Sequence, residues 1–591
     1  MPRRLRLSAL AVLAVLLPLL PARAGAETAR ATVREYRKVF RTYPFSDPDP
    51  VPNPGRIYPY FRFDGFTDRP VDQEWTVVEL ENRWIRVTVM PEIGGKVWTA
   101  VEKSTGKPFL YGNSVVKFRD IAMRGPWTSG GIEANYGIIG HTPNCATPVD
   151  YVLRENPDGS ASVVIGVLDL LTRTPWRLEV KVPPDKAYFT TTSLWHNQTP
   201  LEQPYYTWMN AGYKAAGNLQ FVYPGTHEIG HGGEVGPWPI DEKGRDLSYY
   251  ERNDFGGPKS YHVLGRESDF WGAFWHDDDF GMGRFSPRDE KLGKKIWIWG
   301  LSRQGMIWEK LLTDTDGQYV ELQSGRSFNQ AAEESTRTPF KHRGFVPYGT
   351  DTWTEHWFPV VGTKGLVTGS PLGGLNVALR EGAVDVSLSP LEAVDDTLQV
   401  LDGDKVVFEA PVQAMPLETW TKTAPVSVPK ERLRVRVGHR LEWSGAPDAG
   451  ALSRPLESPA DFDWSSVYGL WLSGKEHLRQ RAYGPAREAL EACLKKDPHY
   501  VPALGDLALL RYRAMDYPGA FDLARRALAV DTYDPLSNYA YGLAAARLGR
   551  TADARDGFEL AAQSVELRSA AWTELARLAI RGGDFERAAF D

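Results

Sequence analysis

The sequence predicts a mostly β protein with a large antiparallel sandwich, a small second β domain and an all-α repeat array at its C-terminal end. Three observations support this fold class. Short alternating strands separated by turn signals fill residues 75–365, a second β-like stretch follows in residues 366–450, and a strict 34-residue period runs through residues 465–591. A chain of 591 residues is also too long for one hydrophobic core, so several domains are expected.

The N-terminal segment has the pattern of a secretory signal peptide. Arg3 and Arg4 precede a long apolar run, and small residues stand at Ala24 and Ala26. A basic start, an apolar stretch and small residues before the cleavage point are typical of such signals. We therefore interpret residues 1–26 as a signal and expect an exported protein, periplasmic or extracellular. No other segment is apolar enough to span a membrane.

Residues 27–365 are expected to form one large β domain. Its first part, residues 27–75, is rich in proline and aromatic residues and should lie extended across the domain surface. Strand patterns follow: in WIRVTVMPEIGGKVWTAVEK, Ile85, Val87 and Val89 alternate with polar residues before a Pro/Gly turn. Many short strands of this kind, without helical periodicity, indicate a large antiparallel sandwich.

The C-terminal third divides into a small β-sandwich domain in residues 366–450, a Pro/Ala/Gly/Ser linker in 451–464 and helical repeats in 465–591. A 34-residue period with paired helices is the signature of tetratricopeptide repeats. Such arrays usually bind proteins, so a protein partner is a candidate; alternatively, the helices pack against the sandwich and wall its cleft. Similar units begin at Tyr483, Tyr517, Thr551 and Phe585.

Charge and composition narrow the function. The chain has 69 basic and 75 acidic residues and no Lys/Arg run, which argues against nucleic acid and anionic membranes as partners. Twenty tryptophans suit either core packing or stacking on sugar rings. Cys145 and Cys493 are expected to be unpaired. His227 and His231 have the spacing of metal ligands, but no third ligand accompanies them, so we expect neither a metal nor a cofactor.

Two segments resemble galactose-mutarotase-like proteins. ELENRWIRVTVMPEIGGKVWTAVEKSTGKPFLY is similar to the opening hairpin of that supersandwich, and GQYVELQSGRSFNQ is similar to the strand that carries its catalytic base. The match falls on Glu321, Gln323 and Asn329, although the leucine follows the glutamate instead of preceding it. The resemblance implies a sugar-binding sheet with Glu321 as the base.

A narrower resemblance covers about residues 35–365. RGPWTSGGIEANYGIIGHTP, PYYTWMNAGYKAAGNLQFVYPGT and TEHWFPVVGTKG resemble a bacterial domain of unknown function (family 5107) that is found ahead of tetratricopeptide arrays. The chain departs from true mutarotases at Trp208, which stands where their general-acid histidine would be. This departure favours a different reaction at the same kind of sugar site.

The first candidates are the proposed base, Glu321, and a group of residues around a Gly-Gly pair. Glu321 lies on a strand with apolar neighbours, where an inward acid must be paired; the alternative is a solvent-facing residue on an edge strand. Glu133, Asn135 and His141 follow a Gly-Gly pair that lets the backbone approach a ligand, and Trp127 could supply a stacking face. The alternative there is a turn with a capping carboxylate.

A second aromatic strand is also a candidate. Glu355 and His356 lie between Trp353 and Trp357, an arrangement that suits sugar rings and hydroxyls or, alternatively, an aromatic core strand with its polar residues outside. On another strand, one face should carry three candidate ligands, with ordinary packing as the competing role for the indole: Tyr206, Trp208 and Asn210.

These observations favour an exported glycoside hydrolase that binds a glycan or oligosaccharide. One carboxylate would protonate the leaving oxygen and the other would activate water or attack, with Glu321 and Glu133 as the leading pair and Glu355 as substitute. An alternative is an aldose 1-epimerase with Glu321 as base and His141 or His356 as acid. A third alternative is a non-catalytic glycan-binding module joined to a protein-interaction array. The expected substrate-binding residues are Trp127, Asn135, Tyr206, Trp208, Asn210, Gln323, Trp353 and Trp357.

Overall fold

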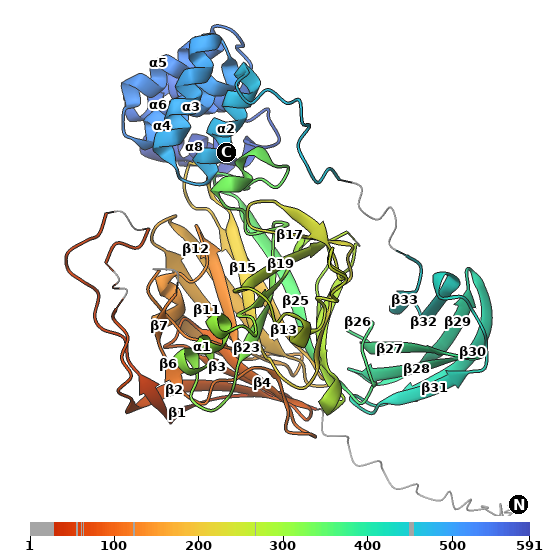
Figure 1. Cartoon of the computed structure of the whole chain (residues 1–591). Helices are drawn as coiled ribbons and strands as arrows, with labels where there is room; N and C mark the ends of the chain where they lie inside the picture. Colours follow the sequence, from red (N-terminus) through yellow and green to blue (C-terminus); the bar gives the residue numbers. More distant parts are fainter. Residues whose placement is uncertain are drawn as a thin grey trace, which may run out of the picture.

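The structure is a computed structural model that describes residues 29–54, 57–60, 62, 64–121, 124–265, 267–447 and 454–591. It has a central β-sandwich, a smaller β unit beside it and a helical array above one end of the sandwich (Figure 1). The expected signal in residues 1–26 lies outside the described residues, as do the first residues of the expected linker, up to 453. The fold class expected from the sequence is confirmed.

The larger sheet of the sandwich follows the expected alternation. On β3 (Ile85–Met90), the three aliphatic residues named above are fully buried, while Arg86 is exposed. The segment expected to lie extended across the surface is partly regular, because residues 32–43 form a long strand paired with residues 71–81. The strand order is β18 (Val235–Pro237), β17 (His227–Ile229), β19 (Lys259–Leu264), β22 (Gly293–Ile298), β23 (Tyr319–Gly325), β15 (Tyr206–Lys214), β9 (Ile132–Gly137), β4 (Lys96–Glu102), β3, β2 (Val71–Glu81), β1 (Thr32–Tyr43) and β6 (Val116–Lys117), with β5 (Pro108–Leu110) beside β4.

The second sheet covers one face of the first and closes the core between them. Much of the aromatic excess is used here, because Trp176, Trp195, Trp271, Trp353 and Trp357 all belong to this core cluster. The sandwich therefore leaves one face of the larger sheet free for other purposes. The order of the second sheet is β10 (Asp150–Glu155), β11 (Ala161–Asp169), β12 (Thr174–Val182), β13 (Phe189–His196), β25 (Thr350–Val361), β21 (Phe280–Phe285), β20 (Phe270–Trp275) and β16 (Leu219–Val222).

The smaller β unit has a core of its own between two four-stranded sheets, built from alternating aliphatic residues such as Leu375, Val386, Leu398 and Val435. One sheet contains β26 (Thr368–Ser370), β27 (Gly373–Arg380), β28 (Ala383–Pro390) and β31 (Trp420–Ala424); the other contains β30 (Lys405–Ala414), β29 (Val394–Asp402), β32 (Leu433–Val437) and β33 (Leu441–Ser444).

The C-terminal helices form four pairs with the expected period. The second helix of each pair begins at one of the four positions that the 34-residue spacing picked out. Ala486, Ala520 and Ala554 recur in phase and are fully buried, because a small side chain there lets neighbouring helices pack closely. None of the described helices has the length and apolarity that a bilayer crossing requires. The helices are α2 (Val467–Arg479), α3 (Tyr483–Lys496), α4 (Val501–Arg513), α5 (Tyr517–Leu528), α6 (Pro535–Arg547), α7 (Thr551–Ala561), α8 (Arg568–Arg581) and α9 (Phe585–Phe590).

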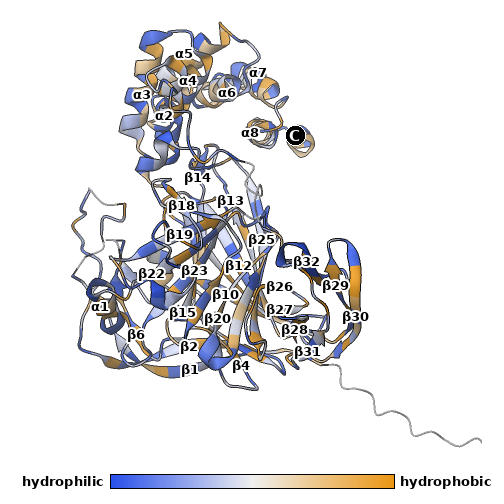
Figure 2. Ribbon diagram, turned by 45° about the vertical axis from the view of Figure 1, so that its right-hand side comes forward, coloured by the Kyte–Doolittle hydropathy of each residue, from blue (hydrophilic) through white to orange (hydrophobic). Residues whose placement is uncertain are grey.

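The first helix of every pair touches the sandwich. The array lies over the end of the sandwich that carries β14 (Gln203–Pro204) (Figure 2). Two sandwich segments, residues 199–202 and 333–348, supply the contacts, so the array and this end of the sandwich are held together at four successive points. The contacts pair Glu476 of α2 with His342, Arg513 of α4 with Glu202, Tyr539 of α6 with Pro200 and Glu574 of α8 with Tyr348.

Candidate functional site

A row of polar side chains crosses the free face of the larger sheet. Asn210 on β15 lies opposite Glu133 on β9 and opposite Gln323 on β23, and Gln323 in turn lies opposite Lys295 on β22. Residues directly opposite in antiparallel pairs point to the same side of a sheet. The apolar residues that alternate with Gln323 on β23 fill the sandwich core, so Glu321 and Gln323 must point to the free face.

Glu321 is buried and fully engaged on this face. It is 5% exposed, the Tyr319 hydroxyl donates to its Oε1 at 2.9 Å, and Gln323 Nε2 donates to its Oε2 at 2.6 Å. Gln330 extends the chain of contacts, because its Nε2 donates to Gln323 Oε1 at 2.9 Å and its Oε1 accepts from Lys295 Nζ. Burial lowers the pKa of Lys295 to about 7 against the opposing pull of Glu321, so this amine can change charge near neutral pH.

Gln330 is held by two histidines as well as by its side-chain contacts. Its backbone N–H donates to His262 Nε2 at 3.1 Å, and its carbonyl oxygen accepts from His231 Nδ1 at 2.8 Å. The carbonyl of Ile229 accepts from His262 Nδ1 at 2.8 Å, so the His262 ring carries its proton on Nδ1. Burial lowers the pKa of His231 to about 4 and that of His262 well below its ordinary value, so both rings are neutral at neutral pH.

Glu133 and His141 form a buried carboxylate–imidazole pair. Glu133 is 3% exposed, and its oxygens lie 3.1 and 3.2 Å from His141 Nδ1 and accept from Trp127 Nε1. Burial alone would raise the pKa of Glu133, but His141 and buried Lys96 outweigh it and hold the pKa at about 2. Because a carboxylate only accepts, His141 carries its proton on Nδ1 and leaves Nε2 for a ligand.

The backbone of His141 has an unusual conformation that is held by a hydrogen bond. It has φ of 54°, in the left-handed region that a histidine rarely occupies, and its N–H donates to Asn135 Oδ1 at 2.7 Å. Such strain persists only where the surroundings hold the residue in place, and it is common at functional sites. Asn135 thus fixes the backbone of His141 while Glu133 fixes its ring.

These groups converge on a cavity of about 380 Å³. One wall is aromatic: Trp299 stacks on Trp308 with ring centroids 4.3 Å apart, and Trp297 meets Trp299 edge-on at 5.6 Å. The size and the mixture of indoles with a few polar groups suit a small polar ligand. The described lining residues are Ile121, Arg124, Trp127, His141, Tyr206, His231, Pro258, Lys295, Trp297, Trp299, Trp308, Glu321, Gln323 and Gln330.

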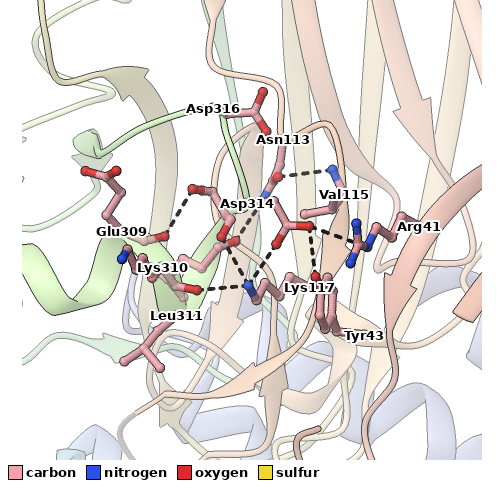
Figure 3. A network of polar contacts seen from close by, with 12 residues as sticks. Arg41, Tyr43, Asn113, Val115, Lys117, Glu309, Lys310, Leu311, Asp314 and Asp316 are labelled. Carbon is pink, nitrogen blue, oxygen red and sulfur yellow. Dashed lines mark hydrogen bonds and ion pairs between the residues drawn. The ribbon is translucent and has the colours of Figure 1, made fainter. Parts of the chain in front are cut away.

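The aromatic wall is anchored through α1 (Arg303–Leu312), the helix that carries Trp308. Lys117 of β6 is buried and donates from Nζ to the carbonyl oxygens of Lys310 and Thr313 and to Asp314 Oδ1, at 2.9, 3.1 and 3.0 Å (Figure 3). A cation that binds the last carbonyls of a helix stabilises its C-terminal end. The helix is therefore tied to the edge of the large sheet.

A second cavity of about 310 Å³ continues from the first toward the helical array, and both share Arg124, Tyr206, His231 and Gln330 among their lining residues. Trp208 lines the second cavity and lies against the sheet. A Cβ atom added at Gly325 would come within 2.3 Å of its ring, so glycine is required there for the indole to lie flat. We call the first cavity the inner cavity and the second the outer cavity.

The structure brings most of the expected site residues together. Trp127, His141, Tyr206, Glu321 and Gln323 line the inner cavity, and Trp208 lines the outer one. The remaining three residues lie in the sheet behind: Glu133 and Asn135 hold His141, and Asn210 lies opposite Glu133 and Gln323.

Four expected residues do not reach either cavity, and their assignment to the sugar site is corrected. The alternation on β25 directs Trp353, Glu355 and Trp357 into the core between the sheets, on the far side of the large sheet from the cavities. His356 points the other way and packs edge-on against Tyr188, with ring centroids 5.1 Å apart. The competing interpretation, an aromatic core strand, holds for both indoles.

Glu355 lies in the core because two cations neutralise it there. Arg284 Nη2 is 2.6 Å and Lys291 Nζ is 3.3 Å from its oxygens, and all three side chains are fully buried. Burial alone would raise the pKa of Glu355, but the two cations outweigh it and lower that pKa. Glu355 therefore links the two sheets, since Arg284 also donates to the carbonyl of Leu322 on β23 at 2.7 Å.

Several residues of the site were not predicted, among them Lys295, Trp297 and Gln330. A signal for two of them existed, because the segment KKIWIWG alternates and places Lys295 and Trp297 on one face, opposite buried Ile296 and Ile298. Gln330 carries no local signal, since its partners lie on other strands and on the loop after β17. Among the described residues no group of three His, Cys, Asp or Glu side chains could hold a metal ion, and both cysteines are free and buried.

Similar solved structures cover most of this chain or about half of it. A crystal structure of a TPR-domain containing protein from Parabacteroides distasonis ATCC 8503 is 18% identical, covers 95% of this chain and 91% of that chain and has a TM-score of 0.50. Galactose mutarotase-like proteins from Lactobacillus casei ATCC 334 and Clostridium acetobutylicum are 10% and 9% identical. They cover 48% of this chain and 99% and 95% of theirs, with TM-scores of 0.35 and 0.36.

The family model "Domain of unknown function (DUF5107)" matches residues 52–360, which is more than half of the chain. This span contains the strands of both cavities and every catalytic candidate named above. The chain is therefore a member of the DUF5107 family.

Proposed function

We propose that the protein is a carbohydrate-active enzyme that cleaves a glycosidic bond by general acid–base catalysis. The observation that carries the proposal is the convergence of a buried carboxylate, Glu321, and a carboxylate-held imidazole, His141, on one tryptophan-lined cavity. Indole faces stack on the apolar faces of sugar rings, and the polar groups between them bind hydroxyls. The cavity volume of about 380 Å³ falls within the range for small ligands.

The geometry revises the roles expected from the sequence. Glu133 was one of two paired carboxylates, but its pKa of about 2 leaves it without a proton to donate, and its oxygens already serve Trp127 and His141. We assign Glu133 to positioning: its oxygens hold the His141 ring through Nδ1. In its doubly protonated form, His141 then donates the Nε2 proton to the leaving oxygen as the glycosidic bond breaks. Glu321 takes a proton from the water that attacks the anomeric carbon, or attacks that carbon itself to form an intermediate that water hydrolyses.

A second candidate function is aldose 1-epimerisation, with Glu321 as base and His141 as acid. The same His/Glu pair favours it, because interconversion of anomers needs one acid and one base around a single sugar. We prefer bond cleavage because the outer cavity extends the site beyond the space that one sugar needs. A non-catalytic glycan-binding module is the third candidate, and it predicts binding without turnover.

A glycan panel with three proteins separates the candidates. The wild type is compared with Glu321→Gln and with the control Glu179→Gln, a glutamate on β12 in the other sheet. We expect turnover to fall by about 10²–10⁴-fold in Glu321→Gln and to stay unchanged in the control. Equal turnover in all three proteins would refute the assignment of Glu321. Optical rotation of free sugars tests the second candidate, since rapid equilibration without cleavage would favour epimerisation.

Our proposal also includes export of the protein and a protein partner for the helical array. We propose that residues 1–26 direct export, which predicts that the mature N-terminus in a periplasmic or secreted fraction begins near residue 27. We also propose that any protein partner binds the array on surfaces turned away from the sandwich, because the first helices already hold Pro200, Glu202 and Tyr348 of this chain. N-terminal sequencing checks the first point.

A further inference from the structure

The outer cavity is lined by an excess of positive charge. Its described lining includes Arg124, Lys341, Arg343 and Arg479, while Glu333 is the one carboxylate among the described lining residues. These cations come from three separate parts of the chain: the loop before β8 (Pro126–Trp127), the segment after β23 and the end of α2. Folding therefore gathers charges that are scattered along the sequence.

Some of this charge is already neutralised and some is not. Arg479 Nε lies 3.4 Å from Glu202 Oε1, and His342 is bound by Glu476 at 2.6 Å. The Arg124 guanidinium donates from Nη1 to the carbonyl of Gly140, at 3.1 Å.

Two further cations also lack a carboxylate. Arg343 donates to the carbonyl of Arg326 at 3.2 Å and lies over the Tyr205 ring at 5.1 Å. Lys341 donates to the carbonyl of Thr336 and lies 5.0 Å from the Trp464 ring. Within the described part of the chain, Arg124, Lys341 and Arg343 form no ion pair.

We propose that the outer cavity is a subsite for an acidic saccharide, a sugar that carries a carboxylate or a sulfate group. This proposal rests on the proposed function for the sugar in the inner cavity. Cations without a carboxylate around one concave site repel one another, and an anion between them replaces that repulsion with charge-assisted hydrogen bonds. Arg124 lines both cavities, so it would contact an acidic group next to the bond that is cleaved.

The helical array is part of this subsite. Arg479 and Gln480 at the end of α2 line the cavity directly. Glu476 accepts from the backbone N–H of His342 at 3.0 Å as well as from its ring, and Gln480 Nε2 donates to Thr336 Oγ1 at 3.2 Å. The array thereby fixes the segment that carries Lys341 and Arg343. The specificity of the enzyme for its acidic sugar would thus depend on the repeats.

Binding measurements on the full chain test the proposal. We would titrate the Glu321→Gln protein, so that no probe is consumed, with tetragalacturonate, a sulfated galactan tetrasaccharide and neutral galactotetraose, by calorimetry. At least one acidic probe should bind about tenfold more tightly than the neutral one at low salt, with the advantage shrinking as salt screens the charges. The two acidic arms show whether carboxylate or sulfate is preferred.

Charge variants locate the site. Arg343→Gln and Lys341→Gln in the same background should each weaken the acidic probe by about three- to tenfold and leave the neutral probe unchanged. The control is Arg154→Gln, an exposed cation on the edge strand β10. Equal affinity for acidic and neutral probes, absence of binding by every acidic probe, or wild-type affinity in both charge variants would each overturn the proposal. Turnover plays no part in these readouts, so failure of the enzymatic proposal is recognised separately.

Discussion

The pairing of Glu133 with His141 makes a prediction in which stability and activity respond together. Replacing Glu133 with glutamine keeps the shape of the side chain and removes its charge. The amide can still accept from Trp127 Nε1 through its oxygen, but it then turns an NH₂ group toward His141 Nδ1–H. Two donors would face each other, so the imidazole loses the partner that fixes its tautomer.

The magnitude of the stability change follows from the pKa of Glu133. The folded state lowers this pKa from its ordinary 4.5 to about 2, and one pKa unit corresponds to about 1.4 kcal/mol, so the charged form stabilises the fold by about 3 kcal/mol at neutral pH. A carboxyl whose pKa is lowered on folding stabilises the protein at pH values above the pKa that the group has in the unfolded chain. This stabilisation should therefore be lost as the pH falls from about 5 toward 2.

Urea unfolding of wild type and Glu133→Gln at pH 7, 5 and 4, with the control Glu179→Gln, measures this difference. The variant should be less stable by about 3 kcal/mol at pH 7, and the gap should narrow toward pH 4. Its turnover should fall by about 10²-fold or more. A stability difference that stays constant across this pH range would show that Glu133 is not charged in the folded protein. Turnover of the variant at the wild-type rate would show that Glu133 does not act through His141.

Two further substitutions test acids to which we assign structural roles, Glu355 in the core and Glu476 in the array. Glu355→Gln should lower the free energy of unfolding in urea by about 3–5 kcal/mol, because it leaves Arg284 and Lys291 buried without their carboxylate. Unchanged stability with lost turnover would instead indicate that Glu355 is catalytic. Glu476→Ala should speed hydrogen exchange in the segment around His342 and weaken binding in the outer cavity, since a charge-assisted hydrogen bond worth about 1.5–3 kcal/mol is lost. Unchanged exchange there would mean that the array does not hold the segment.

Local patterns were enough to predict the fold class and part of the site. The alternation around Glu321 and Gln323 places both on one face of a strand whichever partners it takes, because side chains in a strand alternate regardless of context. The 34-residue spacing fixed the starts of α3, α5, α7 and α9 for a similar reason, since each repeat packs only on its neighbours.

Local patterns could not predict that an acidic residue is buried beside cations from distant parts of the sequence. The alternation on β25 was recognised, but whether Glu355 or His356 would point to the core depends on Arg284 and Lys291, which lie far from it in sequence. A carboxylate is excluded from an aromatic core unless cations are already there. Likewise, Gln330 gains its role only from Lys295 and the two histidines that surround it in space.

The role of the repeats follows from where their contacts fall. If the array served only to recruit a partner, its first helices would be free; instead they hold the sandwich through Glu476, Arg513, Tyr539 and Glu574. The segment held by Glu476 also lines the outer cavity. A surface used in this way cannot release the sandwich to bind a partner without disturbing the cavity. On the proposed function, a protein that bound these inner surfaces would therefore displace the sandwich and weaken saccharide binding in the outer cavity, which is why we place any partner on the outward surfaces of the array.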